Sequence, residues 1–300
     1  MGRRPLRDDN RRNDMKTRLT ILGSGTSSGV PMLGCDCPVC RSADPHDKRL
    51  RASALVEYGG LSILVDCGPD FRQQALRAGI THLDAILLTH NHMDHIGGLD
   101  DTRALNLCES HPVNIYCEPY VEDALRHMYS YAFAEPKYPG APEWHMHTVD
   151  ATAPFKVYSN AGDEVLQWER GFGYRHLGQS GKESQSVEVI PIQGWHHKVK
   201  KLSVLGYRFG DIAYLTDMNL IEDEEFEKLK GLKAVTINCV KPGPHHSHFS
   251  LDECLEFFGR VGAEESYITH ISHLLPCHAD FEKQLPAHVH PAWDGLVIED

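Results

Sequence analysis

The chain has 300 residues, a length that suits one large buried core or two small domains. Its apolar fraction of 41% and charged fraction of 24% are typical of a soluble globular protein. The formal net charge of -12 argues against a long polyanionic partner, because nucleic-acid affinity depends on clustered Lys and Arg. Small anionic substrates stay compatible with that charge if divalent cations are bound.

The sequence contains no pattern of a signal peptide and no run that approaches the roughly 18 to 20 apolar residues of a membrane span. We therefore expect a cytoplasmic protein without a membrane partner. Nine cysteines in such a chain favour reduced thiols and metal ligands over a disulfide framework. The polar, arginine-rich opening predicts a disordered tail over residues 1–16, followed by a single hydrolase domain over 17–300.

The first predicted strand, over 17–22, ends in a Gly/Ser run that lacks the Lys and the spacing of a P-loop, and we interpret it as a tight loop near the active centre. Three thiols follow within six residues, at Cys35, Cys37 and Cys40. Disulfides among themselves are difficult at that spacing, which is instead typical of a zinc cluster that lacks one ligand. We expect the fourth ligand to be a His from elsewhere in the chain.

A hairpin over 53–66 turns at Gly59-Gly60, and a helix over 70–78 follows with Asp70 as its N-cap and Gly79 as its end. The next strand, over 85–88, is short and apolar, and runs directly into the H-x-H-x-D-H pattern of residues 90–95.

This histidine-rich loop has the residue types of a two-metal site. Alternation along an extended backbone places His90 and His92 on one side, so that both imidazoles can bind one metal ion. Asp94 and His95 are adjacent where the chain turns, so their side chains diverge toward a second centre. One carboxylate with three imidazoles suits zinc, manganese or iron and leaves positions open for water.

Beyond this loop we expect a helix over 102–109, a strand over 113–117 and a helix over 119–131 entered at Pro. The stretch that follows is irregular and rich in aromatic residues, which predicts short strands and loops. We treat residues 118–186 as an insert that forms either a lid over the site or an oligomer contact.

Strands of the C-terminal half end repeatedly in residues that can bind metal. A strand over 187–192 leads to His196, a hairpin over 202–215 leads to Asp217, and a strand over 266–269 ends at His270. Ends of separate strands converge when the strands lie side by side in packed sheets, so these residues and the histidine-rich loop predict one site. The other predicted elements of this half are helices over 222–230, 251–261 (with a capping box from Ser250 and Glu253) and 279–285, and strands over 234–239 and 296–298.

H-x-H-x-D-H after an apolar strand, followed by a single His, Asp and His at later strand ends, resembles the metallo-β-lactamase superfamily. The resemblance implies an α/β fold, a four-layer αββα sandwich in a single domain with a two-metal site along one edge. The Cys loop together with Thr269-His270-Ile271-Ser272-His273 is more discriminating. It resembles the PhnP-type branch, phosphodiesterases of the carbon-phosphorus lyase pathway that act on cyclic ribose phosphates.

The same resemblance, transferred residue by residue, implies two divalent ions, Zn²⁺ or Mn²⁺, in the active site and one structural Zn²⁺. The implied ligands are His90, His92 and His196 for the first ion, Asp94, His95 and His270 for the second, Asp217 as a bridge, and Cys35, Cys37, Cys40 and His273 for the structural zinc. His248 falls where the branch places its catalytic histidine. His197 competes with His196 for its role, and His245 and His246 compete with His248.

These assignments predict a dinuclear-metal-dependent hydrolase, a phosphodiesterase for small cyclic phosphodiesters. Two divalent ions lower the pKa of a shared water, and the resulting hydroxide attacks phosphorus in line. Asp94 would orient that hydroxide, and His248 would donate a proton to the leaving oxygen or steady its charge. Asp66 is either a support for a ligand His through a hydrogen bond or an ordinary residue at a strand end.

Two other classes stay open at this point. One is another hydrolase of the superfamily, either ribonuclease Z-like or specific for thioesters or lactams, although the net acidity counts against tRNA and the Cys cluster against lactamases. The other is a PqqB-like cofactor-biosynthesis protein, whose active-site ligands are altered. The natural substrate and a homodimeric state are left open.

Overall fold

The computed structural model describes residues 16–199 and 202–300. The tail predicted over residues 1–16 therefore lies outside the described residues, apart from Lys16. Within the described ranges no helix has the length and apolar character needed to cross a membrane. The cytoplasmic location stays a prediction.

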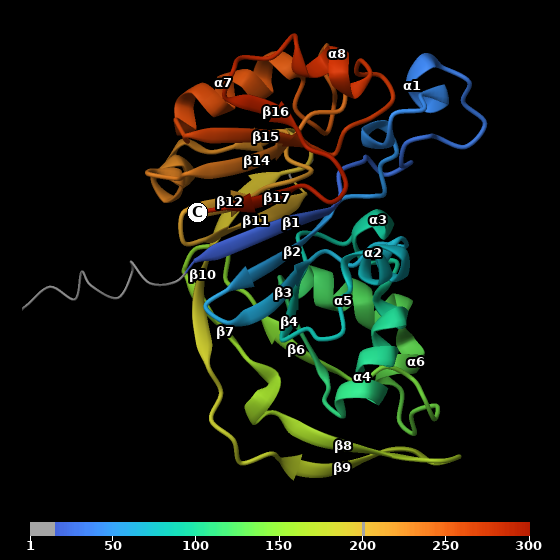
Figure 1. The fold of residues 1–300 in the computed structure, drawn as a ribbon. Coiled ribbons are helices and arrows are strands. Elements are labelled where there is room, and N and C mark those ends of the chain that lie inside the picture. Colours follow the sequence, from blue (N-terminus) through green and yellow to red (C-terminus); the bar gives the residue numbers. More distant parts are fainter. Residues whose placement is uncertain (1–15, 200–201) are drawn as a thin grey trace, which may run out of the picture.

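Two mixed sheets form the middle of the molecule (Figure 1). The first has seven strands in the order β17-β1-β2-β3-β4-β5-β6, of which β3 to β6 run parallel. Its strands are β1 (Thr17–Gly23), β2 (Ser53–Tyr58), β3 (Leu61–Val65), β4 (Ala85–Leu87), β5 (Val113–Cys117), β6 (Trp144–Thr148) and β17 (Val297–Glu299). The carboxyl ends of the parallel strands share one edge, which places the loop after β4 there.

The second sheet has eight strands in the order β13-β10-β11-β12-β14-β15-β16, with β7 paired to β10. Strands β12, β14, β15 and β16 run parallel. The bounds are β7 (Phe155–Tyr158), β10 (Ser186–Trp195), β11 (Ser203–Phe209), β12 (Ile212–Tyr214), β13 (Leu220–Ile221), β14 (Ala234–Asn238), β15 (Glu265–Thr269) and β16 (Val289–Pro291). Strand β10 continues three residues beyond the predicted end, so His196 follows its last residue directly.

The buried core between the sheets draws on both, with Leu19 and Val56 from the first and Leu205 and Tyr207 from the second. Separate apolar clusters lie under the helices on the two outer faces. Helices α2 (Phe71–Ala78), α3 (Met93–Ile96), α4 (Arg103–Glu109), α5 (Pro119–Met128) and α6 (Ser130–Phe133) lie beside the first sheet, and α7 (Leu251–Val261) and α8 (His278–Glu282) cover the second (Figure 1). The predicted four-layer αββα sandwich is confirmed.

Helix ends agree with the sequence in part. The capping box of Ser250 and Glu253 and the left-handed Gly79 after α2 form as predicted. Asp70 does occupy the N-cap position of α2, but its carboxylate accepts from the backbone N–H of Arg51 at 2.9 Å and from its guanidinium at 3.0 Å. The predicted N-cap position of Asp70 is confirmed, but its side chain makes no capping hydrogen bond, because the charged Arg51 donor outcompetes the helix N–H groups.

Two predicted helices differ in detail. The helix over 119–131 is divided at Tyr129, which leaves helical geometry at φ −108° and ψ 40° and separates α5 from α6. The helix over 222–230 is a 3-10 helix, η4 (Asp223–Leu229). Residues three apart eclipse each other in that geometry, and Lys228 pairs with Glu225 at 2.8 Å, while Glu225 also accepts from the backbone of β10.

The region 118–186 contains short strands, as the sequence predicted. Strand β6 extends the first sheet and β7 joins the second, while β8 (Glu164–Glu169) and β9 (Gly173–Gln179) form a separate two-stranded sheet. That hairpin lies at the lower end of Figure 1, at the opposite end from α7 and α8. Its role as a lid or an oligomer contact stays a prediction.

Candidate metal centre

The histidine-rich loop supplies ligands to two neighbouring groups. His92 precedes the one-turn helix α3, which sequence reasoning missed and which carries Asp94 and His95. The predicted ligands form two groups, and within each group the ligand atoms lie within 4.8 Å of one another. One group is His90, His92 and His196, and the other is Asp94, His95, Asp217 and His270. All seven predicted ligand residues of the active site are therefore brought together.

His196 and His197 are placed differently. His196 is buried, and its Nδ1 donates to the backbone carbonyl of Asp217 at 2.6 Å. This bond leaves the Nε2 atom of His196 for the group that it forms with His90 and His92. Among the residues that the structure describes, His197 belongs to none of the candidate metal groups, and its ring lies 6.0 Å from that of His246.

Asp217 stands between the two groups. One of its carboxylate oxygens lies 3.1 Å from Nε2 of His270, and the other lies 3.1 Å from Nε2 of His95. Its backbone has φ +58°, in the left-handed region that non-glycine residues rarely adopt. His270 and Asp66 share this geometry at φ +53° and +62°, so three residues of the centre hold strained backbone where strands turn into it.

Asp66 supports one histidine of each group through hydrogen bonds. Its Oδ2 accepts from Nδ1 of His95 at 2.6 Å and from the hydroxyl of Thr89 at 2.9 Å. Because the Thr89 hydroxyl donates to Asp66, it accepts from Nδ1 of His90, 2.9 Å away. One carboxylate thus places the ring hydrogen of both imidazoles on Nδ1 and turns both Nε2 atoms toward the centre. Thr89 carries no sequence signal beyond its place before His90, and sequence reasoning missed it.

Buried ring nitrogens without partners test whether this centre suits metal ions. The Nε2 atom of His90 is buried and makes no hydrogen bond, and those of His95 and His270 make none either, although each lies 3.1 Å from an oxygen of Asp217. A buried nitrogen without a partner is costly, and a cation would satisfy it. Imidazoles with carboxylates are the ligands that zinc and related divalent ions prefer, so the residues fit such ions.

The electrostatics agree with a site for cations. Burial alone would raise the pKa of Asp217, but the neighbouring His270 and His95 imidazoles outweigh it and hold that pKa well below its usual range. Burial also raises the pKa of Asp94, and His95 and His270 again more than offset it. Burial lowers the pKa of His90 well below its ordinary value. Burial alone would lower the pKa of His95 and His270, but the same carboxylates outweigh it and raise the pKa of both. The centre therefore holds ionised carboxylates beside these two imidazoles and a neutral His90.

His248 lies against both groups. It is 9% exposed, and its ring centroid is 4.7 Å from those of His196 and His270. Its competitors lie further out, since His245 stacks on His248 at 5.1 Å and His246 is exposed. Burial, with His270 nearby, lowers the pKa of His248 to about 2, so its imidazole is neutral at pH 7.

The predicted structural zinc residues also meet. The ligand atoms of Cys35, Cys37, Cys40 and His273 lie within 4.8 Å of one another, with Nδ1 of His273 3.2 Å from the sulfur of Cys35. The helix α1 (Pro38–Arg41) begins directly after Cys37, and the Cys40 N–H and then His273 lower the pKa of the Cys37 thiol to about 6. Burial raises the pKa of Cys40 to about 11.

A short segment joins the thiol cluster to the metal centre. Ile271 pairs with the loop after β1: its N–H donates to Ser24 at 2.8 Å, and its carbonyl accepts from Thr26 at 3.0 Å. Since His270 precedes Ile271 and His273 follows it by two residues, the Gly/Ser loop fixes a segment that serves both groups. Gly25 is needed there, because a Cβ would stand 2.9 Å from the carbonyl oxygen of Leu50.

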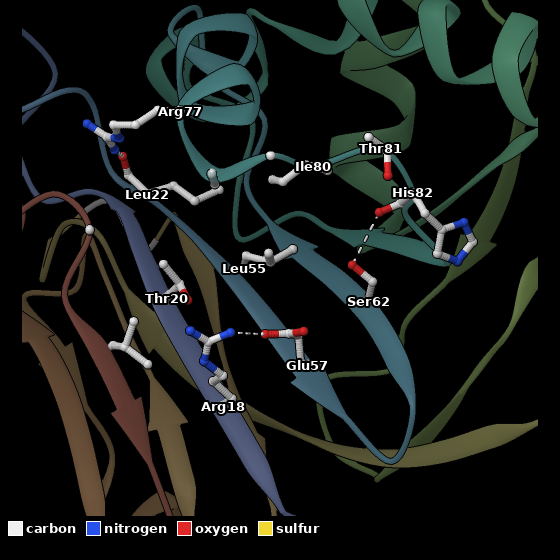
Figure 2. A pocket seen from close by; sticks show the side chains of 14 residues that line it. Arg18, Thr20, Leu22, Leu55, Glu57, Ser62, Arg77, Ile80, Thr81 and His82 are labelled. Atoms are coloured by element: carbon white, nitrogen blue, oxygen red, sulfur yellow. Dashed lines mark hydrogen bonds and ion pairs between the residues drawn. The ribbon is translucent and has the colours of Figure 1, made fainter.

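A hollow of about 470 Å³ on the outer face of the first sheet lies apart from this centre (Figure 2). None of the candidate ligands lines it. Figure 2 shows Arg18 directed at Glu57, 3.0 Å away, and Arg77 of the same hollow pairs with Asp294 at 3.2 Å. With these guanidinium groups paired, the hollow offers no evident anion site.

Comparison with known proteins identifies the family. The family model described as the beta-lactamase superfamily domain matches residues 62–271. A crystal structure of a new diphosphatase from the PhnP family is 38% identical to this chain, with a TM-score of 0.77, and the match covers 95% of this chain and 98% of the other. The chain belongs to the metallo-β-lactamase superfamily, within its PhnP family. The predicted superfamily and branch are confirmed.

Two further relatives say less about the function of this chain. An octanoyltransferase from Porphyromonas gingivalis is 40% identical over 281 residues, but the match covers 93% of this chain and 51% of the relative, so the chain spans about half of that protein. The zinc-bound PqqB structure from Methylobacterium extorquens is 17% identical, with 94% of this chain and 99% of that chain covered and a TM-score of 0.64, a likeness of fold alone.

Membership of this family and the fold support a metal-dependent hydrolase, the activity taken up in the proposal below. The fold implies divalent metal ions, and the Cys₃His cluster is present.

Proposed function

We propose that the chain is a dinuclear-metal-dependent phosphodiesterase that acts on small, cyclic phosphodiesters. The observation that carries the proposal is the pair of ligand groups that meet at Asp217, whose two carboxylate oxygens each lie 3.1 Å from a histidine Nε2. A pair of groups sharing a carboxylate is the arrangement that enzymes use to hold two cations near one phosphoryl group.

The chain's residues divide between three ions in this proposal. The first active-site ion, Zn²⁺ or Mn²⁺, is assigned to His90, His92 and His196, the second to Asp94, His95 and His270, and Asp217 bridges them; a structural Zn²⁺ is assigned to Cys35, Cys37, Cys40 and His273. When bound, paired divalent ions lower the pKa of water and draw negative charge from phosphoryl oxygens.

Asp94 and His248 are the residues that we assign to substrate chemistry. The Asp94 side chain is 13% exposed against 2% for Asp217, so it is the carboxylate within reach of an entering water molecule. Its Oδ2 lies 3.2 Å from His95, which leaves the other oxygen to orient the attacking water. His248 is held neutral by burial, a state in which it steadies the leaving oxygen as a hydrogen-bond donor rather than giving up a proton from an imidazolium.

We propose a small substrate rather than a nucleic acid or a membrane lipid. The net charge of -12 disfavours a long polyanion, and the Lys198 ammonium near the centre is already paired with Glu253 at 2.8 Å. A ribonuclease Z-like activity is accordingly the weaker alternative.

A diphosphatase is the second candidate, and the specific observation in its favour is the 38% identity to the PhnP-family diphosphatase. Two cations suit a phosphoanhydride as well as a phosphodiester, since both place charge on phosphoryl oxygens. The name octanoyltransferase belongs to a relative about twice as long, and we do not carry that activity to this chain.

A substrate panel tests the proposal. Protein reconstituted with Zn²⁺ or Mn²⁺ should hydrolyse bis(p-nitrophenyl) phosphate and cyclic ribose phosphates, and should leave thioesters and tRNA precursors intact. Turnover of diphosphates alone would replace the proposal by the second candidate. Absence of hydrolysis of every phosphate ester by metal-loaded protein would remove both.

Variants locate the activity. His92→Ala and Asp217→Ala should each abolish turnover, because each removes a ligand of the shared centre. His196→Ala should do the same, while the matched variant His197→Ala should keep activity, since His197 stands outside the ligand groups. Full activity of His92→Ala or Asp217→Ala would contradict the assigned centre.

A further inference from the structure

Besides the Nε2 atoms named above, two buried ring nitrogens of the centre make no hydrogen bond, Nδ1 of His270 and Nδ1 of His248, and of these residues only His248 is outside the seven assigned ligands. The Nδ1 atom of His248 is buried and makes no hydrogen bond. It lies 3.7 Å from Oδ1 of Asp217, which is beyond hydrogen-bond distance. A buried polar atom requires a partner, and the Asp217 carboxylate is too far away to be that partner.

The position of His248 is set by the turn that carries Asp217. The Asn219 amide donates to the backbone carbonyl of His248 at 2.9 Å, and the Phe249 N–H donates to the carbonyl of Met218 at 3.1 Å. Asn238 accepts from the Met218 N–H at 2.7 Å and so fixes the same turn to β14. His248 and Asp217 therefore belong to one rigid unit, and the close approach of Nδ1 to the carboxylate is built into the backbone.

The ring is also confined from both sides. His196 meets it edge-on at an interplanar angle of 72°, and His270 lies on another side at 34°, each with a centroid distance of 4.7 Å. A ring packed between two assigned metal ligands has little freedom to turn Nδ1 elsewhere.

We propose that Nδ1 of His248 is an additional metal ligand of this centre, acting with His196 and Asp217. The ligand atoms of these three residues lie within 4.8 Å of one another, the same closeness that joins the other two groups. Nitrogen and oxygen atoms bound to one zinc at about 2.0 to 2.2 Å stand roughly 3 to 3.7 Å apart, a range that includes the separation of His248 and Asp217.

This assignment gives His248 two roles on opposite nitrogens. When the lone pair of Nδ1 is directed to an ion, the ring hydrogen of a neutral imidazole resides on Nε2. His248 can then offer an Nε2–H to the leaving oxygen of the substrate while the same ring helps to hold the ion. The inference rests on the metal binding within the proposed function but not on the identity of the substrate.

Its two histidine neighbours provide matched controls. Nδ1 of His245 already accepts from the Ser247 N–H at 3.3 Å, and His246 is exposed. Among the described residues neither belongs to a candidate metal group. Substitution of either one changes the segment that carries His248 without removing an assigned ligand.

Cobalt substitution tests the inference without reference to turnover. Co²⁺-loaded protein is compared with His248→Ala and His245→Ala by calorimetric titration and by visible absorption. We expect His248→Ala to weaken Co²⁺ binding at one site by about tenfold or more and to change the absorption, with partial restoration by added imidazole. His245→Ala should match the unaltered protein in both measurements.

A measurement on the unaltered protein guards against a variant that fails to fold. Ring N–H protons of histidines bound to Co²⁺ give strongly shifted proton NMR signals. With Zn²⁺ kept in the Cys₃His cluster, so that His273 gives no such signal, the unaltered protein should show one more signal than the five histidines assigned to the active site supply. A count of five, or a His248→Ala protein with native affinity and absorption, would overturn the inference. Co²⁺-loaded unaltered protein that binds the metal as expected but hydrolyses no phosphodiester would count against the proposed function alone, because the binding measurements do not depend on turnover.

Discussion

Single residues outside the ligand set decide how the centre is arranged. Asp66 is fully buried, and its carboxylate takes hydrogen bonds from His95 and, through Thr89, holds His90. One carboxylate therefore orients a histidine in each of the two ligand groups. A change at this position should affect both ions together rather than one.

We predict that Asp66→Asn reduces metal retention at both active-site positions. An Asn that keeps its oxygen where Oδ2 accepts from His95 and the Thr89 hydroxyl places its NH₂ group at the Oδ1 position, against the Thr89 backbone N–H that donates there at 2.8 Å. It also lacks the negative charge that strengthens the hydrogen bond from His95. Loss of such a supporting bond typically weakens metal binding by about 10- to 100-fold. Elemental analysis after dialysis measures the effect, and Thr89→Ser serves as the conservative control. Retention of both ions by Asp66→Asn would show that the carboxylate does not position them.

A second residue-scale prediction concerns pH. His82 lies between two carboxylates, with Nε2 3.2 Å from Asp84 and Nδ1 2.8 Å from Glu109, and these hydrogen bonds raise its pKa from 6.5 to about 10. A raised folded-state pKa contributes stability that is complete below about pH 6.5 and is lost as pH rises through about 10. His82→Asn should therefore destabilise the protein more at pH 6 than at pH 10, as measured by urea unfolding. An equal loss at both values would contradict the charged pairing.

At the scale of elements, the segment from His270 to His273 joins the two candidate metal clusters. His270 follows β15 directly with its backbone at φ +53°, and Ile271 is bonded on both sides to the loop after β1. The thiol cluster therefore anchors the element that presents His270. A disturbance at the thiols has a direct path to the second ligand group.

We predict that Cys37→Ser lowers thermal stability first and affects turnover less. Removing one thiolate opens the cluster around His273, whose Nδ1 lies 3.5 Å from the Cys37 sulfur. Structural zinc sites contribute directly to folding energy, so the midpoint of unfolding should fall by several degrees. Calorimetry together with zinc content measures this, and Cys108→Ser, at an exposed cysteine outside the cluster, is the control. Unchanged stability with one zinc fewer would show that the cluster does not anchor the segment.

The elements and the site differ in how far the sequence predicts them. Apolar patterns located β1 to β5, β10 to β12, β14 and β15 well but not the two-residue β13, and motif spacing located the ligands because metal chemistry restricts residue types strongly. The one-turn helix α3, the short strand β16 and the supporting Thr89 carry no local pattern, since they depend on contacts made after folding. The sequence located Asp70 at the N-cap but could not show that its carboxylate accepts hydrogen bonds from Arg51, which is distant in sequence.

For the whole molecule, the metal centre spans the two halves of the sandwich. His90, His92 and the turn of α3 follow a strand of the first sheet, whereas His196, Asp217 and His270 follow strands of the second. The apolar core joins the sheets along their length, and the ligands join them at one edge. Bound ions therefore act as cross-links between the sheets as well as parts of the chemistry.

We predict that chelation lowers the unfolding temperature of the whole chain by about 5 to 10 °C. Ligands that bind only the folded state stabilise it by about 4 kcal/mol at a thousandfold excess over Kd, and each kcal/mol shifts the midpoint of a chain this large by roughly 2 °C. Removing the ions also leaves the carboxylates of Asp94 and Asp217 close to each other, with the neighbouring imidazoles to offset their repulsion. Calorimetry before and after dialysis against a chelator measures the shift. The same treatment of His92→Ala should give a smaller shift, because that variant already holds the first ion weakly, while Cys37→Ser should keep the part of the shift that comes from the active site. Equal midpoints with and without chelator would mean that the ions do not cross-link the sheets.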